Sequence, residues 1–148
     1  MKVTGIQNGT LSFDINQDDH HFTVDGDKNF GGEGKGPTPK GLLISGLVGC
    51  TGMDVASILR KMKIIYEKLE LSAETEYTED HPKVFKDIVM KYFIEGDPNI
   101  DTAKIKRAVE LSMTKYCGVT EILKKNSDIS YIIYLNGEEI HGKESLSK

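Results

Sequence analysis

Residues 37–55, PTPKGLLISGLVGCTGMDV, hold the pattern that decides the fold. From residue 42 to about residue 64, apolar side chains occupy nearly every face of a helical projection, at least through its first half. A helix of this kind needs cover on most sides, so the pattern predicts a long central helix over residues 42–64. The apolar run stops short of the ~20 residues that a membrane span requires, and Asp54 interrupts it. We therefore expect no membrane helix.

The segments before this helix predict strands and then a loop. Residues 1–30 contain short alternating runs broken by Asn8-Gly9, a strong signal for a tight turn, and they favour an antiparallel β-meander. Residues 31–41, GGEGKGPTPKG, contain five glycines and two prolines, which disfavour regular structure. We expect a surface loop there.

Residues 65–148 predict a hairpin, further helices and a final strand. KLELSAETEYT (68–78) and VFKDIVMKYFIEG (84–96) alternate apolar and polar residues, as paired half-buried strands do. Asp101 is the expected cap of a helix that ends near Cys117, and VTEILKK (119–125) predicts a short helix. The last strand should turn at Asn136-Gly137 before a polar tail that we expect to fray.

Together these patterns predict one α+β domain over residues 1–148, with antiparallel sheets around the central helix. That helix is too apolar to stay exposed in a monomer, so we expect a homodimer to bury it.

Composition and charge exclude several classes of function. The chain is 38% hydrophobic with a formal net charge of −4, and it lacks the clustered positive charge that attracts nucleic acid. Its first residues, MKVTGIQNGTLSF, lack the apolar stretch of a signal peptide, which favours a cytoplasmic protein. GGEGKG lacks the spacing of a phosphate-binding loop, so no nucleotide is expected. We expect no other cofactor either.

Two cysteines, Cys50 and Cys117, are the residues with unusual chemistry. In a reducing cytoplasm, a pair 67 residues apart is not a structural disulfide framework. The two side chains could be inert buried thiols, a redox pair, or half of a metal site. A peroxide reductase needs a thiolate that attacks the O–O bond and a second thiol that resolves the sulfenic acid. Composition alone leaves these alternatives open.

PTPKGLLISGLVGCTGMDV, followed about 65 residues later by KYCGVTEIL, resembles the two cysteine motifs of the OsmC/Ohr family of osmotically inducible and organic hydroperoxide resistance proteins. The order of the expected elements also matches that family over nearly the whole chain. The resemblance implies an OsmC-like fold, an intertwined homodimer and an organic hydroperoxide as the substrate. By the same resemblance, Cys50 would be the peroxidatic thiol and Cys117 the resolving thiol, restored by an external dithiol reductant.

The chain departs from the family at three positions. Lys40 stands where the family's hydroperoxide reductases carry a glutamate, and Gly118 replaces a proline after the second cysteine. Those enzymes also hold the thiolate with an arginine from the N-terminal half, whereas the first arginine here is Arg60. Arg60 lies ten residues beyond Cys50, about 15 Å along a helix, so we interpret it as a salt-bridging surface residue.

Another cation must therefore lower the pKa of Cys50. Lys35 and Lys40 are the candidates, and the loop of a partner subunit is the better source than the loop of the same chain. Asp54, four residues after Cys50, would raise the pKa of the thiol and so needs a partner of its own. Thr51 is expected to line the site.

Two alternatives to a peroxidase remain. Without the arginine and glutamate of the family, the chain could be a non-enzymatic protein that binds a small apolar ligand, or a slow redox sensor. A metal site is not expected. His20 and His21 should point to opposite faces of a strand, and His81 beside Asp80 is typical of a surface turn.

Overall fold

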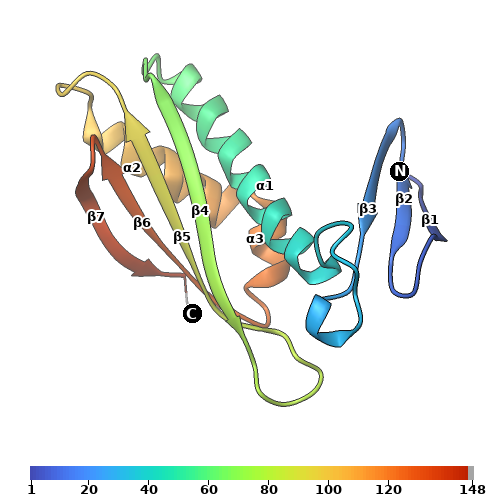
Figure 1. Cartoon of the computed structure of the whole chain (residues 1–148). Coiled ribbons are helices and arrows are strands. Elements are labelled where there is room, and N and C mark those ends of the chain that lie inside the picture. The colour runs from blue at the N-terminus through green and yellow to red at the C-terminus, as the bar shows by residue number, and fades with distance from the viewer. Residues whose placement is uncertain (147–148) are drawn as a thin grey trace. The chain divides into compact units, whose positions relative to one another are not determined.

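The computed structural model describes residues 1–146 (Figure 1). Its contacts divide the chain into two compact units, Met1–Ser45 and the part from Gly46 onward. The boundary falls inside helix α1 (Pro39–Lys61), and each unit has a sheet of its own. The expectation of one domain over residues 1–148 stays a prediction.

The N-terminal unit contains the predicted antiparallel meander of β1 (Val3–Gln7), β2 (Phe13–Gln17) and β3 (His20–Val24). The predicted tight turn at Asn8-Gly9 is wrong, because neither residue has the positive φ that such a turn requires. The Asn8 N–H instead bonds to the carbonyl of Ser12 at 3.1 Å and closes a wider connection. His20 and His21 are exposed on β3, as expected.

The glycine-rich loop is tied to the end of β3 by a buried carboxylate. Asp25, 1% exposed, accepts hydrogen bonds from the backbone N–H groups of Gly26, Glu33 and Lys35 at 2.7, 2.9 and 3.0 Å. The N–H of Lys35 contributes most to holding the pKa of Asp25 below its usual range. The loop is therefore fixed by specific bonds.

Helix α1 begins three residues before the predicted start at residue 42. Pro39 is its first residue, and the Thr38 hydroxyl accepts a hydrogen bond from the N–H of Gly41 at 3.2 Å. A capping threonine followed by proline is a favourable helix start, which the glycines nearby obscured in the sequence.

Less of the surface of α1 is buried than its sequence predicts. Only one stripe is buried, with members four residues apart: Leu47, Thr51, Val55 and Leu59. Other apolar side chains remain open, and Met53 is 71% exposed. Among the described residues, α1 is also long and apolar enough by length and composition to cross a membrane, a test that core helices of soluble proteins also pass. The expectation that it was too short is corrected.

The second unit contains a four-stranded sheet in the order β4 (Lys68–Tyr77), β5 (Phe85–Glu95), β6 (Asp128–Leu135) and β7 (Glu138–Ser145). β4 and β5 form the predicted antiparallel hairpin. β5 and β6 run parallel, so the expectation of purely antiparallel sheets is wrong. Their connection holds α2 (Thr102–Leu111) and α3 (Gly118–Leu123), which makes it long enough to return the chain to the same end.

The predicted frayed tail is also partly wrong. The chain pairs with β6 as far as Ser145, whose partner is Ser130. The last two residues of the predicted tail, 147–148, lie outside the described residues.

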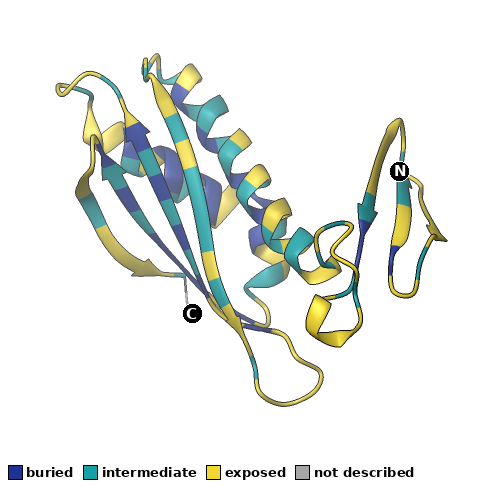
Figure 2. Cartoon of the chain, in the orientation of Figure 1, coloured by how far each residue is buried: buried dark blue, intermediate teal, exposed yellow. Residues whose placement is uncertain are grey.

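The helices of this unit lie on one face of the sheet (Figures 1 and 2). A Cβ atom added at Gly52 of α1 would lie 3.6 Å from Leu71 of β4, so the helix packs closely on the strand. β5 and β6 supply most of the buried face: Ile88, Met90, Tyr92, Ile94, Ile129, Tyr131, Ile133 and Leu135. This packing fixes the positions of α1, α2 and α3 around the cysteines.

Truncation of Ile105 in α2 tests this core. Ile105 is fully buried, so Ile105→Ala should lower the free energy of unfolding by about 2–5 kcal/mol. Ile122→Ala in α3 is the matched control, because Ile122 is 67% exposed and its loss should change stability by less than about 0.5 kcal/mol. Urea unfolding of both variants measures the difference, and equal losses would contradict the packing described.

Candidate functional site

Cys50, Asp54 and Cys117 form a group that we call the thiol cluster. The two sulfur atoms and a carboxylate oxygen of Asp54 all lie within 4.8 Å of one another. Both thiols are free; Cys50 is partly exposed and Cys117 is 4% exposed. Cys50 and Asp54 lie one turn apart on α1, and Cys117 comes from the start of α3. The fold therefore brings together residues 67 positions apart.

The chain before α3 sets the position of Cys117. Asp101 caps α2 as predicted, by accepting hydrogen bonds from the N–H groups of Ala103 and Lys104. After α2, the π-helical turn Ser112–Tyr116 ends in a bond from the Cys117 N–H to the Ser112 carbonyl at 3.0 Å.

Two backbone N–H groups of α3 point at the sulfur atoms. The Thr120 N–H donates to Cys117 Sγ at 3.3 Å, so the cysteine acts as the helix cap. The Val119 N–H donates to the sulfur of Cys50. These donors stabilise negative charge on sulfur.

The surroundings of Cys50 nevertheless favour the thiol over the thiolate. Burial is the main cause that raises the pKa of Cys50 above its ordinary value, and the Cys117 thiol and the Asp54 carboxylate act in the same direction. The Val119 N–H lowers the pKa in part. None of these causes is a cation. The main influences on the pKa of Cys50 therefore include no replacement for the arginine that the family's hydroperoxide reductases place beside the thiolate.

Asp54 has a hydrogen-bond partner, as expected, but the sequence did not indicate which residue it is. The Ser112 hydroxyl donates a hydrogen bond to Asp54 Oδ2 at 3.1 Å, and Ser112 is fully buried. The two residues are 58 positions apart, so no local sequence signal linked them. Ser112 thereby orients the carboxylate beside the two sulfurs.

The other residues expected at the site have different surroundings. Thr51 is fully buried, and its hydroxyl donates a hydrogen bond to the Val48 carbonyl at 3.4 Å. Lys35 forms an ion pair with Glu33 at 2.5 Å in the N-terminal unit, and Lys40 lies in the first turn of α1. Their support of the thiolate stays a prediction.

Arg60 is exposed, as expected. It has no ion pair within residues 1–146, which corrects the expectation of a surface salt bridge.

A hollow of about 330 Å³ reaches the thiol cluster at Asp54. Its walls are mainly apolar, with one lysine: Ser57, Ile58, Lys61, Met62, Leu111 and Tyr116 complete the lining. Lys61 was not among the residues expected at the site. Its position seven residues after Asp54, two turns along the same helix face, was the available signal.

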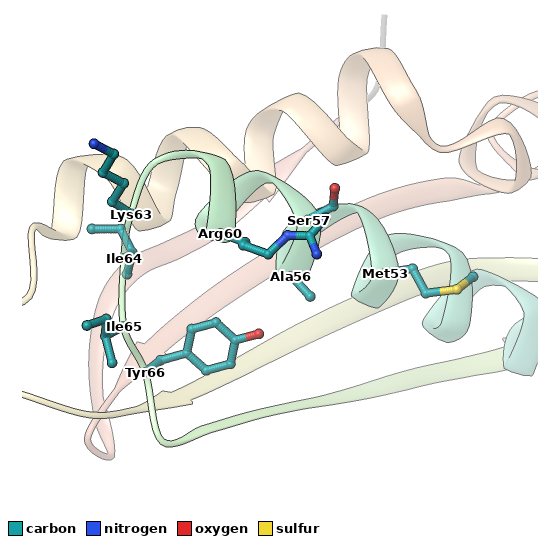
Figure 3. A pocket seen from close by; sticks show the side chains of 8 residues that line it. All are labelled: Met53, Ala56, Ser57, Arg60, Lys63, Ile64, Ile65 and Tyr66. Atoms are coloured by element: carbon teal, nitrogen blue, oxygen red, sulfur yellow. The ribbon is translucent and has the colours of Figure 1, made fainter.

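A larger hollow of about 670 Å³ lies at the end of α1 (Figure 3) and contains no member of the thiol cluster. Its lining combines apolar side chains with two cations: Met53, Ala56, Ser57, Arg60, Lys63, Ile64, Ile65 and Tyr66. Figure 3 shows that the helix supplies Met53 and Arg60, and that the following loop supplies Ile65 and Tyr66. This larger hollow is thus separate from the two sulfurs of the thiol cluster, which carry the reactive chemistry.

Neutralising Asp54 should make Cys50 more acidic. Burial is the main cause of the raised pKa of Cys50, and the Asp54 charge adds to it. Asp54→Asn removes this added charge but keeps an oxygen that can accept the Ser112 hydrogen bond. We expect a lower pKa for Cys50, measured by pH-dependent alkylation in a Cys117→Ser background. Asp87→Asn, at an exposed position of β5, is the control and should leave the pKa unchanged. A higher pKa in Asp54→Asn would contradict the described electrostatics.

Comparison with known proteins finds matches over most of the chain. The profile described as OsmC-like protein matches residues 32–132. Protein YhfA of Escherichia coli K12 is 30% identical over 112 residues, which cover 76% of this chain and 80% of that protein.

Two solved structures show the likeness in three dimensions. A hypothetical protein from Aquifex aeolicus is 26% identical with a TM-score of 0.76, over 91% of this chain and 96% of that one. An organic hydroperoxide resistance protein, OsmC, from Legionella pneumophila is 15% identical with a TM-score of 0.66, over 90% of this chain and 97% of that one. At that identity, the Legionella protein supports the fold alone.

Proposed function

Because the chain belongs to the OsmC-like protein family, we propose that it reduces organic hydroperoxides with Cys50 as the peroxidatic thiol and Cys117 as the resolving thiol. The observation that carries the proposal is the presence of two free sulfurs within 4.8 Å of each other. Cys50 is the more exposed of the two, so a peroxide reaches it more easily.

The chemistry needs no metal and no bound cofactor. The Cys50 thiolate attacks one peroxide oxygen, the O–O bond breaks, and a proton converts the leaving oxygen to an alcohol. The Cys117 thiolate then attacks the sulfur of the sulfenic acid, which forms a disulfide and releases water. An external dithiol restores both thiols and becomes a disulfide itself.

The raised pKa of Cys50 sets the pH dependence. The thiolate is the reactive form, so the rate should be low at neutral pH and should rise with pH above the range of an ordinary cysteine. The apolar walls of the smaller hollow suit an organic peroxide better than hydrogen peroxide, and Lys61 can attract a negatively charged substrate.

A cytoplasmic homodimer is part of the proposal. α1 exposes apolar side chains, including Leu43 at 51% and Met53 at 71%, which a second copy would cover. An intertwined arrangement would also allow the partner subunit to bring a loop lysine, Lys35 or Lys40, to the thiol. Neither nucleic acid nor a membrane is an expected partner.

Peroxide consumption tests the proposal directly. Reduced protein is mixed with cumene hydroperoxide, or with hydrogen peroxide, in the presence and absence of a dithiol reductant. We expect many turnovers of cumene hydroperoxide with the reductant, slower loss of hydrogen peroxide, and about one equivalent consumed without reductant. Unchanged thiols and unchanged peroxide concentration would refute the peroxidase.

A second candidate function is the binding of a small apolar ligand, which the hollow of about 670 Å³ favours. Its apolar lining and two cations, Arg60 and Lys63, suit an amphipathic anion such as a fatty acid. Calorimetric binding of a fatty acid that Met53→Glu abolishes and Cys50→Ser leaves unchanged would favour this function. No binding by the wild type would exclude a fatty-acid ligand.

A further inference from the structure

The thiol cluster combines the types of ligand that borderline-soft divalent cations prefer. Zinc is bound in proteins by thiolates, imidazoles and carboxylates, and sites with three protein ligands keep a fourth position open. We propose that Cys50, Asp54 and Cys117, in their reduced form, bind one zinc-class divalent cation. This inference goes beyond the peroxidase and does not rest on it.

The distances are compatible with a common metal ion after small side-chain movements. In a tetrahedral site, Zn–S bonds of about 2.3 Å and Zn–O bonds of about 2.0–2.2 Å place the ligand atoms roughly 3.5–3.8 Å apart. The three atoms here lie within 4.8 Å of one another. The difference is about 1 Å at most, which rotation of the side chains can supply.

Each ligand comes from a fixed element. Cys50 and Asp54 are four residues apart on α1, a spacing that puts both side chains on one helix face. Cys117 enters from the start of α3 and provides the third atom from another direction. Two ligands from one helix turn and one from a separate element give a three-point site.

Neighbouring groups hold these ligands in orientation. The Ser112 hydroxyl bonds to Asp54 at 3.1 Å, and the N–H groups of Val119 and Thr120 bond to the two sulfurs. Hydrogen bonds of this kind tune metal sites and position their ligands. The Thr120 hydroxyl, in the same turn as Cys117, is buried and has no hydrogen-bond partner within residues 1–146.

Charge and proton balance follow from the ligand set. Each thiol releases one proton to solvent as its sulfur binds the cation, and nothing is oxidised or reduced. Two thiolates and one carboxylate then surround a charge of +2. A disulfide between Cys50 and Cys117 removes both thiolates, so the metal-bound and oxidised forms of the cluster exclude each other.

Cobalt titration followed by zinc competition tests the site in the full-length protein. Metal is removed from the reduced protein with a chelator, and Co²⁺ is then added under anaerobic conditions. We expect a thiolate-to-cobalt charge-transfer absorption that saturates at one equivalent and disappears when Zn²⁺ displaces the cobalt. Protein oxidised beforehand to the disulfide should give no such absorption.

Variants assign the absorption to the cluster. Cys50→Ser and Cys117→Ser should each reduce its intensity. Asp54→Asn should weaken Zn²⁺ binding by at least about 10-fold, because the loss of a group that only orients a metal ligand already costs that much affinity. Asp87→Asn is the matched control and should bind like the wild type. Circular dichroism checks that the variants remain folded.

The inference is overturned if reduced wild-type protein gives no charge-transfer absorption. Binding that is as tight in Asp54→Asn as in the wild type, or an absorption that survives in Cys50→Ser unchanged, also overturns it. The peroxide assay is run with chelator present, so a metal-free peroxidase and a metal-binding protein without peroxidase activity give different results.

Discussion

Replacing Cys50 with serine should abolish peroxide turnover, whereas replacing Cys117 with serine should preserve a single reaction. A serine at position 50 cannot form the sulfenic acid, so the rate should fall to that of uncatalysed peroxide loss. With serine at position 117, Cys50 still attacks the peroxide but its sulfenic acid finds no second thiol within 4.8 Å. Stopped-flow peroxide loss and a sulfenic acid probe measure both outcomes.

The two variants serve as controls for each other, because each removes one sulfur from the same cluster. Without reductant, Cys117→Ser should consume about one equivalent of peroxide and retain the probe on Cys50. Equal turnover in the two variants would contradict the assigned roles. A probe adduct on Cys117 in the Cys50→Ser protein, together with normal turnover, would reverse them.

Alanine at Gly36 should destabilise the N-terminal unit by about 3 kcal/mol, the upper end of the usual cost of overpacking. A Cβ atom at this position would lie 2.0 Å from the Thr23 carbonyl oxygen and 2.7 Å from its carbon. Both are backbone atoms and cannot rotate away, so the loop must separate from β3. That movement would break the hydrogen bond of 3.1 Å between the Asp25 N–H and the Pro37 carbonyl.

Gly46→Ala is the matched control for this substitution. Gly46 lies in α1 with nothing within 4 Å of an added Cβ, so alanine should stabilise the helix by about 0.5–1 kcal/mol. Urea unfolding, with hydrogen exchange of residues 23–37, measures both variants. Equal stability of Gly36→Ala and the wild type would contradict the close contact between the loop and β3.

Local signals in the sequence predicted much of the fold. Asn136 and Gly137 both have positive φ, 50° and 84°, so this Asn-Gly pair forms the two-residue hairpin turn that it favours. The Asn8-Gly9 pair does not form this turn, because a connection of five residues separates β1 from β2. Turn propensity is a local preference, and strand pairing decides whether it is used.

The parallel pairing of β5 with β6 had no local signal. Strand direction depends on the path of the whole connection, and the alternation of residues in a strand is similar in both directions. The narrow burial of α1 was also beyond prediction, because its sequence does not tell which partner covers each face.

The sequence predicted which residues belong to the candidate site, but it did not predict the contacts between them. Cys50, Cys117 and the need of Asp54 for a partner followed from residue chemistry and helical spacing. The partner itself, Ser112, and the donor Val119 depend on contacts between distant segments. Lys61 had a local signal, since it shares a helix face with Asp54, and could have been found.

The most direct test of the central claim is the mass of the protein after one equivalent of cumene hydroperoxide without reductant. Peptide mapping of the same sample identifies any cross-link between cysteines. The account predicts the loss of two hydrogen atoms and a disulfide that joins Cys50 to Cys117, whose sulfurs lie within 4.8 Å of each other. Two intact thiols after complete mixing, with the peroxide still present, would contradict it.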